Sequence, residues 1–251
     1  MDRNEPIEQA APWLATPFVA ADTPLAAPRS GLATSLLAWL REPGGPSALE
    51  ALFDARAGGS VQACLRAEGA LPGELALLAA ASEQALVEDP SLDPAAPLPY
   101  VQPVCLGRPV AWLHRRALPV NDLPERCRWL AERGRHLRLR LRLHPLQPLP
   151  RARDQVARRR AASSVASQSW DPVTIGLEHA ERLLDAFVFT LTIESRAPLG
   201  PAERTLLLAA LHVGFTPLAR LDGRSRPALA ESSLAHRLLQ SVVGVGPETE
   251  E

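Results

Sequence analysis

Residues 136–144 (HLRLRLRLH) alternate strictly between leucine and a basic or imidazole side chain, and this alternation constrains the fold more than any other stretch. Successive side chains of a β-strand point to opposite faces of a sheet, whereas a helix would distribute the arginines around its circumference. The pattern predicts a strand whose leucines are buried on one face and whose arginines, Arg138, Arg140 and Arg142, are exposed on the other. Pro145 ends the strand, because proline cannot donate to the hydrogen-bond ladder.

These three arginines, called the arginine row below, are followed by a second basic segment. Its arginines are Arg151, Arg153, Arg158, Arg159 and Arg160. The whole chain has a formal net charge of −1, yet residues 108–160 carry 15 arginines and only 4 acids, while the flanking regions are acidic. All 27 basic residues are arginine, which the codon usage of a GC-rich genome could explain, but such usage would not concentrate them in one region.

A concentrated basic region on a nearly neutral chain suggests a polyanionic partner. The planar guanidinium group binds pairs of phosphate oxygens, so RNA or DNA is one interpretation of both basic stretches. Three arginines on one face of a strand also repel one another unless an anion is near. The alternative for the row is a solvated face of the sheet, and the alternative for the segment at 151–169 is an ordinary helix with a basic, solvated face. We expect this segment to be exposed and to become ordered on nucleic acid.

His136 and His144 lie at the two ends of the predicted strand and share the face of the arginines. Histidine titrates near neutral pH, so these two are the candidates for acid or base chemistry beside a bound phosphate. The six histidines show no HExxH spacing, and the chain has no CxxC pair, phosphate-binding loop or dinucleotide fingerprint. We therefore expect no metal site and no cofactor.

The first hundred residues predict helices. Residues 1–30 are rich in alanine and proline and predict an irregular segment, and 31–41 predicts an amphipathic helix. Ser47 and Glu50 have the spacing of a capping box, which predicts a helix over 48–57, before a short strand at 61–66 and a helix at 72–88. The proline-rich stretch 89–99 predicts a linker. Residues 31–99 are thus expected to form a largely helical N-terminal part.

The remainder alternates strands with helices. Strands are predicted at 100–106, 109–113, 187–194 and 213–217, and helices at 123–134, 151–169, 176–186, from Pro201 onward and at 228–240. This order predicts an α+β fold with a ferredoxin-like, RRM-like unit at 100–245, followed by a disordered tail at 246–251.

The chain shows no signal-peptide pattern and no apolar run of 18 residues. Its cysteines, Cys64, Cys105 and Cys127, are odd in number and widely spaced, which does not suggest a disulfide framework. These features predict a cytoplasmic protein with no membrane partner.

The C-terminal half resembles a known family. Residues 136–160 (HLRLRLRLHPLQPLPRARDQVARRR) are similar to the strand, proline-containing turn and basic segment of CRISPR repeat-RNA endoribonucleases. Those enzymes belong to the CRISPR-associated RAMP superfamily of ferredoxin-like RNA-binding proteins. Residues 187–215 (FVFTLTIESRAPLGPAERTLLLAALHVGF) similarly resemble their last strand-helix-strand unit. The resemblance implies binding of a CRISPR repeat or guide RNA within a ribonucleoprotein in antiviral defence. It also implies metal-independent cleavage in those members that cut.

The sequence therefore favours an RNA-binding subunit of a ribonucleoprotein complex, which uses the arginine row and the basic segment and either cuts the RNA or only holds it. The competing hypothesis is a structural subunit of a bacterial multiprotein assembly, in which the basic face contacts an acidic protein. An enzyme acting on a small anion is a third hypothesis, for which no recognisable site is present.

Overall fold

The structure is a computed structural model. It describes residues 13–16, 18–24, 30–71, 73–82, 86–88, 97–106, 122–146, 150–163, 184–209, 212–213, 216–217, 219–221 and 227–244. Within these ranges, nine strands form one antiparallel sheet, and two further strands, β8 and β9, form a separate short ladder. Six helices accompany the strands in the same part of the chain, so the fold is of mixed α and β structure.

The strands of the large sheet stand in the order β10-β5-β7-β6-β2-β3-β1-β4, and β11 pairs with β7 outside this path. The strands are β1 (Leu14–Ala15), β2 (Ala48–Ala55), β3 (Val61–Glu68), β4 (Val87–Glu88), β5 (Tyr100–Leu106), β6 (Leu137–Pro145), β7 (Phe187–Ser195), β8 (His212–Val213), β9 (Thr216–Pro217), β10 (Ala219–Leu221) and β11 (Ala228–Ala230). The helices are α1 (Ser30–Trp39), α2 (Glu74–Ala81), α3 (Asp122–Glu132), α4 (Pro150–Ser163), α6 (Pro201–Ala209) and α7 (Ser232–Val243).

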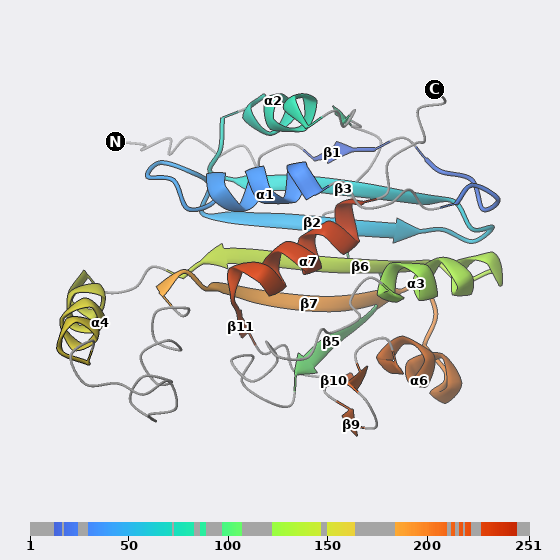
Figure 1. Cartoon of the computed structure of the whole chain (residues 1–251). Helices are drawn as coiled ribbons and strands as arrows, with labels where there is room; N and C mark the ends of the chain where they lie inside the picture. Colours follow the sequence, from blue (N-terminus) through green and yellow to red (C-terminus); the bar gives the residue numbers. More distant parts are fainter. Residues whose placement is uncertain are drawn as a thin grey trace, which may run out of the picture.

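One face of the sheet is covered by helices, with α1, α3 and α7 lying along the central strands (Figure 1). The leucines of β6 point to this face and are at most 1% exposed. Opposite them in the register stand Leu49, Ala51, Phe53 and Ala55 of β2 on one side and alternate residues of β7 on the other. The helix-covered face therefore holds the hydrophobic core, and β6 lies at its centre.

The predicted helix over 48–57 is wrong, because these residues form β2, which pairs with β3 along its whole length. The connection is a tight hairpin in which Gly58 and Gly59 have φ angles of 96° and 84°. The N–H of Gly59 donates to the backbone oxygen of Arg56, so Ala57 and Gly58 are the central residues of the turn, and glycine adopts the positive φ at 58 and 59 without steric strain. The N-terminal part is consequently not largely helical. Its hairpin supplies two central strands, and β2 pairs with β6 of the C-terminal part.

The N-terminal segment contributes to the sheet instead of being irregular throughout. β1 pairs with β3 and with β4, and Val19 forms an isolated bridge with Val61. Arg128 of α3 is buried and donates to the backbone oxygens of Ala20 and Ala21, which holds this segment against the body of the protein.

Most of the other predicted elements form, with shifted ends. The helices predicted at 31–41, at 123–134 and from Pro201 are confirmed as α1, α3 and α6, and the strands at 61–66, 100–106 and 187–194 as β3, β5 and β7. The helix at 72–88 ends at Ala81 and is followed by β4; the one at 228–240 begins only at Ser232, after β11; and 213–217 is divided between β8 and β9. The predictions at 109–113, 176–183 and 246–251, and most of the linker at 89–99, lie outside the described residues.

From β5 onward, the sheet has a regular connection pattern. Along the chain the described elements follow as β5, α3, β6, α4, β7, α6, β8, β9 and β10, while in the sheet four of the strands stand as β10-β5-β7-β6. Helix α4 is inserted between β6 and β7, and in Figure 1 it stands beyond the end of the sheet, away from α3 and α6.

Candidate functional site

The arginine row lies on the face of the sheet opposite the helices, called the charged face below. The strand at 136–144 is confirmed as β6, its four leucines are buried, and the three arginines share one face as predicted. The predicted exposure is wrong. Arg138 is only 8% exposed, and Arg140 and Arg142 are partly buried among side chains of the neighbouring strands.

Carboxylates of β2 and β7 surround Arg140. Its Nη1 donates to Oε1 of Glu50 at 2.8 Å, and its Nε donates to Oε1 of Glu194 at 2.6 Å. Burial alone would lower the pKa of this guanidinium, but the two carboxylates outweigh that effect and raise it. Glu50 shows the reverse: burial would raise its pKa, and Arg140 and Arg66 lower it below its ordinary value. Both groups are therefore held in their charged forms.

Asp54 of β2 is the deepest charged group on this face, with no exposed surface. It accepts hydrogen bonds at Oδ1 from Nε2 of His136 at 2.7 Å and from Nε of Arg138 at 3.2 Å, and at Oδ2 from Nε of Arg56 at 3.2 Å. Burial would raise the pKa of Asp54, but these three partners outweigh the desolvation and lower it. The buried carboxylate thus organises one end of the row.

The other end of the row is more open. Arg142 donates from Nη2 to Oε2 of Glu68 at 2.7 Å, reaching diagonally across β2, where Glu50 is opposite Arg142 and Ala48 is opposite Glu68. The side chains of Arg142 and Glu68 are 40% and 30% exposed, whereas those of Arg138 and Asp54 are 10% and 0% exposed. The row is therefore progressively more accessible from Arg138 to Arg142.

The charges on this face balance within the described part of the chain. Four arginines (Arg66, Arg138, Arg140 and Arg142) interact with four carboxylates (Glu50, Asp54, Glu68 and Glu194). Mutual repulsion of the row had suggested an external anion, and the chain itself supplies the anions from β2, β3 and β7. Nucleic acid would have to displace carboxylates already bonded to the row, so the centre of the row is a poor phosphate site.

A small apolar cluster lies under the charged groups. Trp13 packs with Ala15, Leu52 and Cys64, and the guanidinium of Arg66 lies 4.8 Å from the centroid of the Trp13 ring. The indole face favours a nearby cation, so Trp13 both covers Leu52 and positions Arg66 toward Glu50.

His136 and His144 are at opposite ends of β6. At about 3.3 Å per residue, the eight steps between them separate their Cα atoms by roughly 26 Å. His136 is bonded to Asp54, whereas Nδ1 of His144 lies 3.3 Å from the backbone oxygen of Ser47. The two predicted catalytic residues cannot act together on one phosphate.

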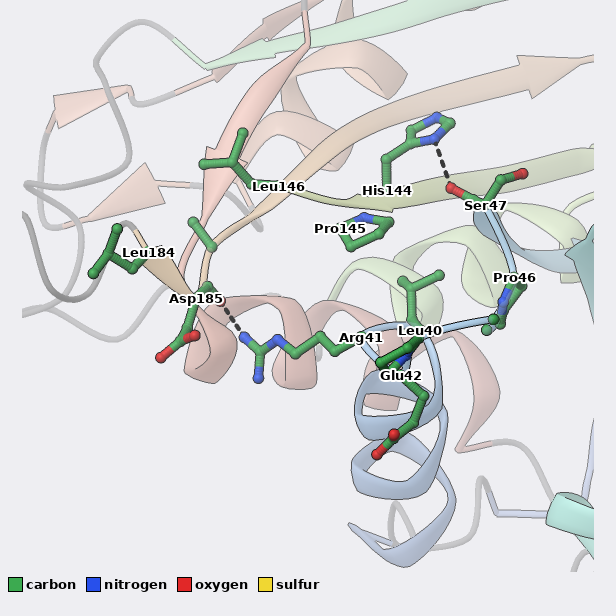
Figure 2. Close-up of a pocket in the computed structure, with 14 residues that line it drawn as sticks. Leu40, Arg41, Glu42, Pro46, Ser47, His144, Pro145, Leu146, Leu184 and Asp185 are labelled. Carbon is green, nitrogen blue, oxygen red and sulfur yellow. Dashed lines mark hydrogen bonds between the residues drawn. The ribbon is translucent and has the colours of Figure 1, made fainter. Parts of the chain in front are cut away.

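Figure 2 shows the pocket of about 710 Å³ beside His144, between the 42–47 turn and the adjacent ends of β6 and β7. His144 and Ser47 lie on one side of Pro145, and Arg41 lies on the other side with Asp185. Arg41 donates to the backbone oxygen of Asp185 and to Oγ of Ser232, and it stacks on the ring of Phe187. This pocket is lined largely by proline, glycine and leucine, and its arginine serves to join α1 to the start of β7 and α7.

Helix α4 differs from the row in its surroundings. It contains the five arginines of the second basic segment and one acid, Asp154. Among its described side chains, Arg158 and Arg159 are exposed, Val156 is half-buried, and neither arginine has a hydrogen-bond partner. The side chains of Arg151, Arg153 and Arg160 are outside the described set. The predicted binding residues therefore fall into two groups. The arginines of the row are paired with carboxylates, whereas the described arginines of α4 are exposed.

The carboxylates of the charged face were missed by the sequence analysis. Glu50 and Asp54 alternate with inward-pointing residues of β2, but the capping-box spacing of Ser47 and Glu50 favoured a helix there. The signal for the hairpin was the Gly58–Gly59 pair between two alternating segments.

The described residues contain no group of three or more histidine, cysteine or acidic side chains that could hold a metal ion. No helix in the described ranges is long and apolar enough to cross a bilayer. Comparisons of this chain with models of protein families, with curated proteins and with solved structures found no match.

Proposed function

We propose that this chain binds RNA and that helix α4, rather than the arginine row, makes the principal contact. The observation that carries the proposal is the exposure of Arg158 and Arg159 on a helix that has five arginines and one acid. A surface helix of this charge fits a phosphate backbone, because each guanidinium can donate two parallel hydrogen bonds to phosphate oxygens.

We further propose that residues 100–221 form a ferredoxin-like unit. In that fold the strands of a β-α-β-β-α-β unit stand in the order fourth, first, third and second. The order β10-β5-β7-β6, with α3 and α6 as the connecting helices, supports this assignment. The insertion of α4 between the second and third strands makes the basic helix an addition to the unit.

The chemistry of the charged face supports the choice of α4 over the sheet. RRM-type sheets bind single-stranded RNA by stacking bases on aromatic side chains of central strands. On β6 and β7, the side chains of the charged face are arginine, threonine, glutamate and valine, and the one ring among them is the imidazole of His144 at the end of β6. Base stacking on these two strands is therefore not part of the proposal.

The resemblance to RAMP proteins supports a CRISPR repeat or guide RNA as the ligand and a ribonucleoprotein as the setting. Cleavage by His136 and His144 as an acid–base pair is not included, because the length of β6 keeps them apart. The proposed role is RNA binding without a catalytic contribution from that pair.

An acidic protein surface is the competing partner, since guanidinium groups bind carboxylates in the same forked geometry. If the partner is a protein, the free chain should bind an acidic polypeptide more tightly than RNA at the same salt concentration.

The test measures binding of a labelled stem-loop RNA with single-stranded flanks over a salt series. The variant is Arg158→Ala/Arg159→Ala, and the matched control is Arg133→Ala, which removes an exposed arginine from the turn after α3. Each lost contact to a single strand lowers the slope of log affinity against log salt by about 0.7, so the double variant should lower it by about 1.4. The control should bind as the parent does.

Two outcomes would contradict the proposal. If the α4 variant and the parent have equal affinities and equal salt slopes, α4 is not the interface. If the parent does not bind RNA even at low salt but binds an acidic polypeptide through Arg158 and Arg159, the partner is a protein.

A further inference from the structure

A second pocket, of about 440 Å³, opens at the His136 end of β6. Three turns form it: the β2–β3 hairpin, the α3–β6 connection and the β7–α6 connection. The residues that line it are Arg56, Ala57, Gly134, Arg135, His136, Ser195, Arg196 and Ala197. The topology thus brings three arginines from three separate parts of the chain to one cavity, although the sequence analysis gave none of them a role.

The guanidinium groups at this pocket keep most of their donors unused. Arg56 donates only from Nε, to Asp54, and Arg135 donates only from Nε, to Glu203 at 2.6 Å. The side chain of Arg196 is exposed and donates to no group among the described residues. The terminal Nη nitrogens of all three arginines therefore lack a protein acceptor within the described part of the chain. Arg140, in contrast, uses both Nε and Nη1 on carboxylates.

Two of the three arginines are held in place by acids beside the pocket. Asp54, which is buried, fixes Arg56 and also His136 on the pocket wall. Glu203 of α6 accepts from Arg135 at Oε1 and from the backbone N–H of Gly200 at Oε2, so that its orientation is fixed as well. Such preorganised donors lose little conformational entropy when an anion arrives.

The charge around the pocket is positive. Asp54 is shared between Arg56, His136 and Arg138, and Glu203 is paired with Arg135, which leaves Arg196 uncompensated among the described residues. An anion with several oxygens directed at separate donors would complete the arrangement. A phosphate group has that shape and carries up to two charges, whereas a carboxylate presents only two oxygens in one plane.

We propose that this pocket is a binding site for a phosphate group, held by Arg56, Arg135 and Arg196. The site does not depend on RNA binding by α4, because the pocket and α4 lie at opposite ends of β6. The phosphate can come from inorganic phosphate or a small phosphate monoester, or from the end of a nucleic-acid strand, and these sources share the same recognition chemistry.

The test is calorimetric titration of the full chain, at low ionic strength, with inorganic phosphate, a nucleoside 5′-monophosphate and a short RNA with or without a 5′-phosphate. The diagnostic variant is Arg196→Ala, because this exposed side chain has no described partner and its loss should leave the fold intact. Removal of one charge-assisted contact should weaken phosphate binding about tenfold or more, and Arg196→Lys should restore part of it. Arg158→Ala/Arg159→Ala, which changes α4, should bind phosphate as the parent does.

The ligands distinguish the source. Binding of inorganic phosphate and the monophosphate, lost in Arg196→Ala, supports a site for small phosphates. An effect of Arg196→Ala only on RNA that carries the 5′-phosphate supports a site for a strand end. The proposal is overturned if no phosphate-bearing ligand binds, or if Arg196→Ala and Arg135→Ala bind all of them as tightly as the parent. Phosphate binding that is lost in Arg196→Ala, together with unchanged RNA binding in Arg158→Ala/Arg159→Ala, would retain this site and remove the α4 interface. Loss of RNA binding in the α4 variant, with no phosphate binding by the parent, would remove only this site.

Discussion

The arginine row on β6 and the arginines of α4 are separated by only a few residues, yet their environments are opposite. Each arginine of the row contacts a carboxylate from another strand of the sheet, and Arg138 is nearly inaccessible. Arg158 and Arg159 of α4 are exposed and have no partner among the described residues. A strand inside a sheet has neighbours on both sides that can neutralise it, whereas α4 stands beyond the end of the sheet and no described strand neutralises Arg158 or Arg159. The density of arginine therefore does not by itself identify a binding surface.

The largest difference between the two regions should appear when one acid is removed from each. Asp54→Asn leaves the buried Arg138 without its charged partner, and the free energy of unfolding should fall by about 3 kcal/mol or more. Asp154→Asn on α4 is the matched control and should leave it unchanged, because that carboxylate is exposed. Urea unfolding followed by circular dichroism measures both. Equal stabilities of the two variants would show that the row is not a buried ionic network.

A smaller effect is expected in the coupling between pairs. A double-mutant cycle with Arg140→Ala and Glu194→Ala should give an interaction energy of about 1–3 kcal/mol, since the two groups are in contact and largely buried. The corresponding cycle for Asp154 and Arg158, which are four residues apart on α4, should give no measurable coupling in 0.15 M salt, because exposed pairs are screened. Additive effects at Arg140 and Glu194 would contradict the assignment of a direct ion pair.

Acid pH should weaken the ion pairs of the arginine row, and with them the free energy of unfolding, and should leave the helix α4 unchanged. The pKa values of Glu50 and Asp54 are lowered in the folded protein from ordinary values of 4.5 and 3.8. The unfolded chain therefore binds more protons than the folded one as the pH falls below these values. The stabilisation is fully present above about pH 5 and is lost as the pH falls through the folded pKa values. Unfolding measured at successive pH values should show this loss, and Glu50→Gln should reduce it; an identical acid dependence in that variant would argue against the Glu50 interaction.

The smallest effect is expected at the open end of the row. Arg142→Ala should lower the free energy of unfolding by about 0.5–1 kcal/mol, because its pair with Glu68 is partly exposed. Arg138→Ala should be clearly more destabilising, since it leaves Asp54 buried with fewer partners. Thermal and urea unfolding of the two variants side by side would reveal this gradient. The reverse order would mean that solvent, and not the carboxylates, stabilises the row.

Much of the fold could be predicted because the patterns were long and regular. The alternation in β6 and β7 and the apolar stripe of α1 predicted the element type correctly. Residues 48–57 could not be assigned in the same way. Leu49, Leu52 and Phe53 have the spacing of one helical face, and the same segment is also compatible with a strand. Pairing with β3 and β6 decides in favour of the strand, and that information is not local.

The candidate site was predicted less completely than the fold. The sequence identified the arginines of the row and of α4 but not the carboxylates that neutralise the row, since Glu50, Asp54, Glu68 and Glu194 come from strands that are far from β6 in sequence. It also gave no indication that Arg56, Arg135 and Arg196 meet at one pocket. Arg56 and Arg196 are isolated arginines next to turns, and Arg135 lies just before the alternation of the row; none of them belongs to a motif.

The alternation in 136–144 was sufficient to predict a strand with buried leucines and with arginines on one face, because side-chain alternation is a property of the strand alone. The contacts of those arginines depend instead on how the strands are arranged in the sheet. Their partners are chosen by the register between β6, β2 and β7, which places Asp54 and Glu194 on either side of Arg138. Ionic interactions depend on distance in space and not on separation along the chain. An arginine inside the sheet therefore binds a carboxylate, whereas an arginine on α4 remains available.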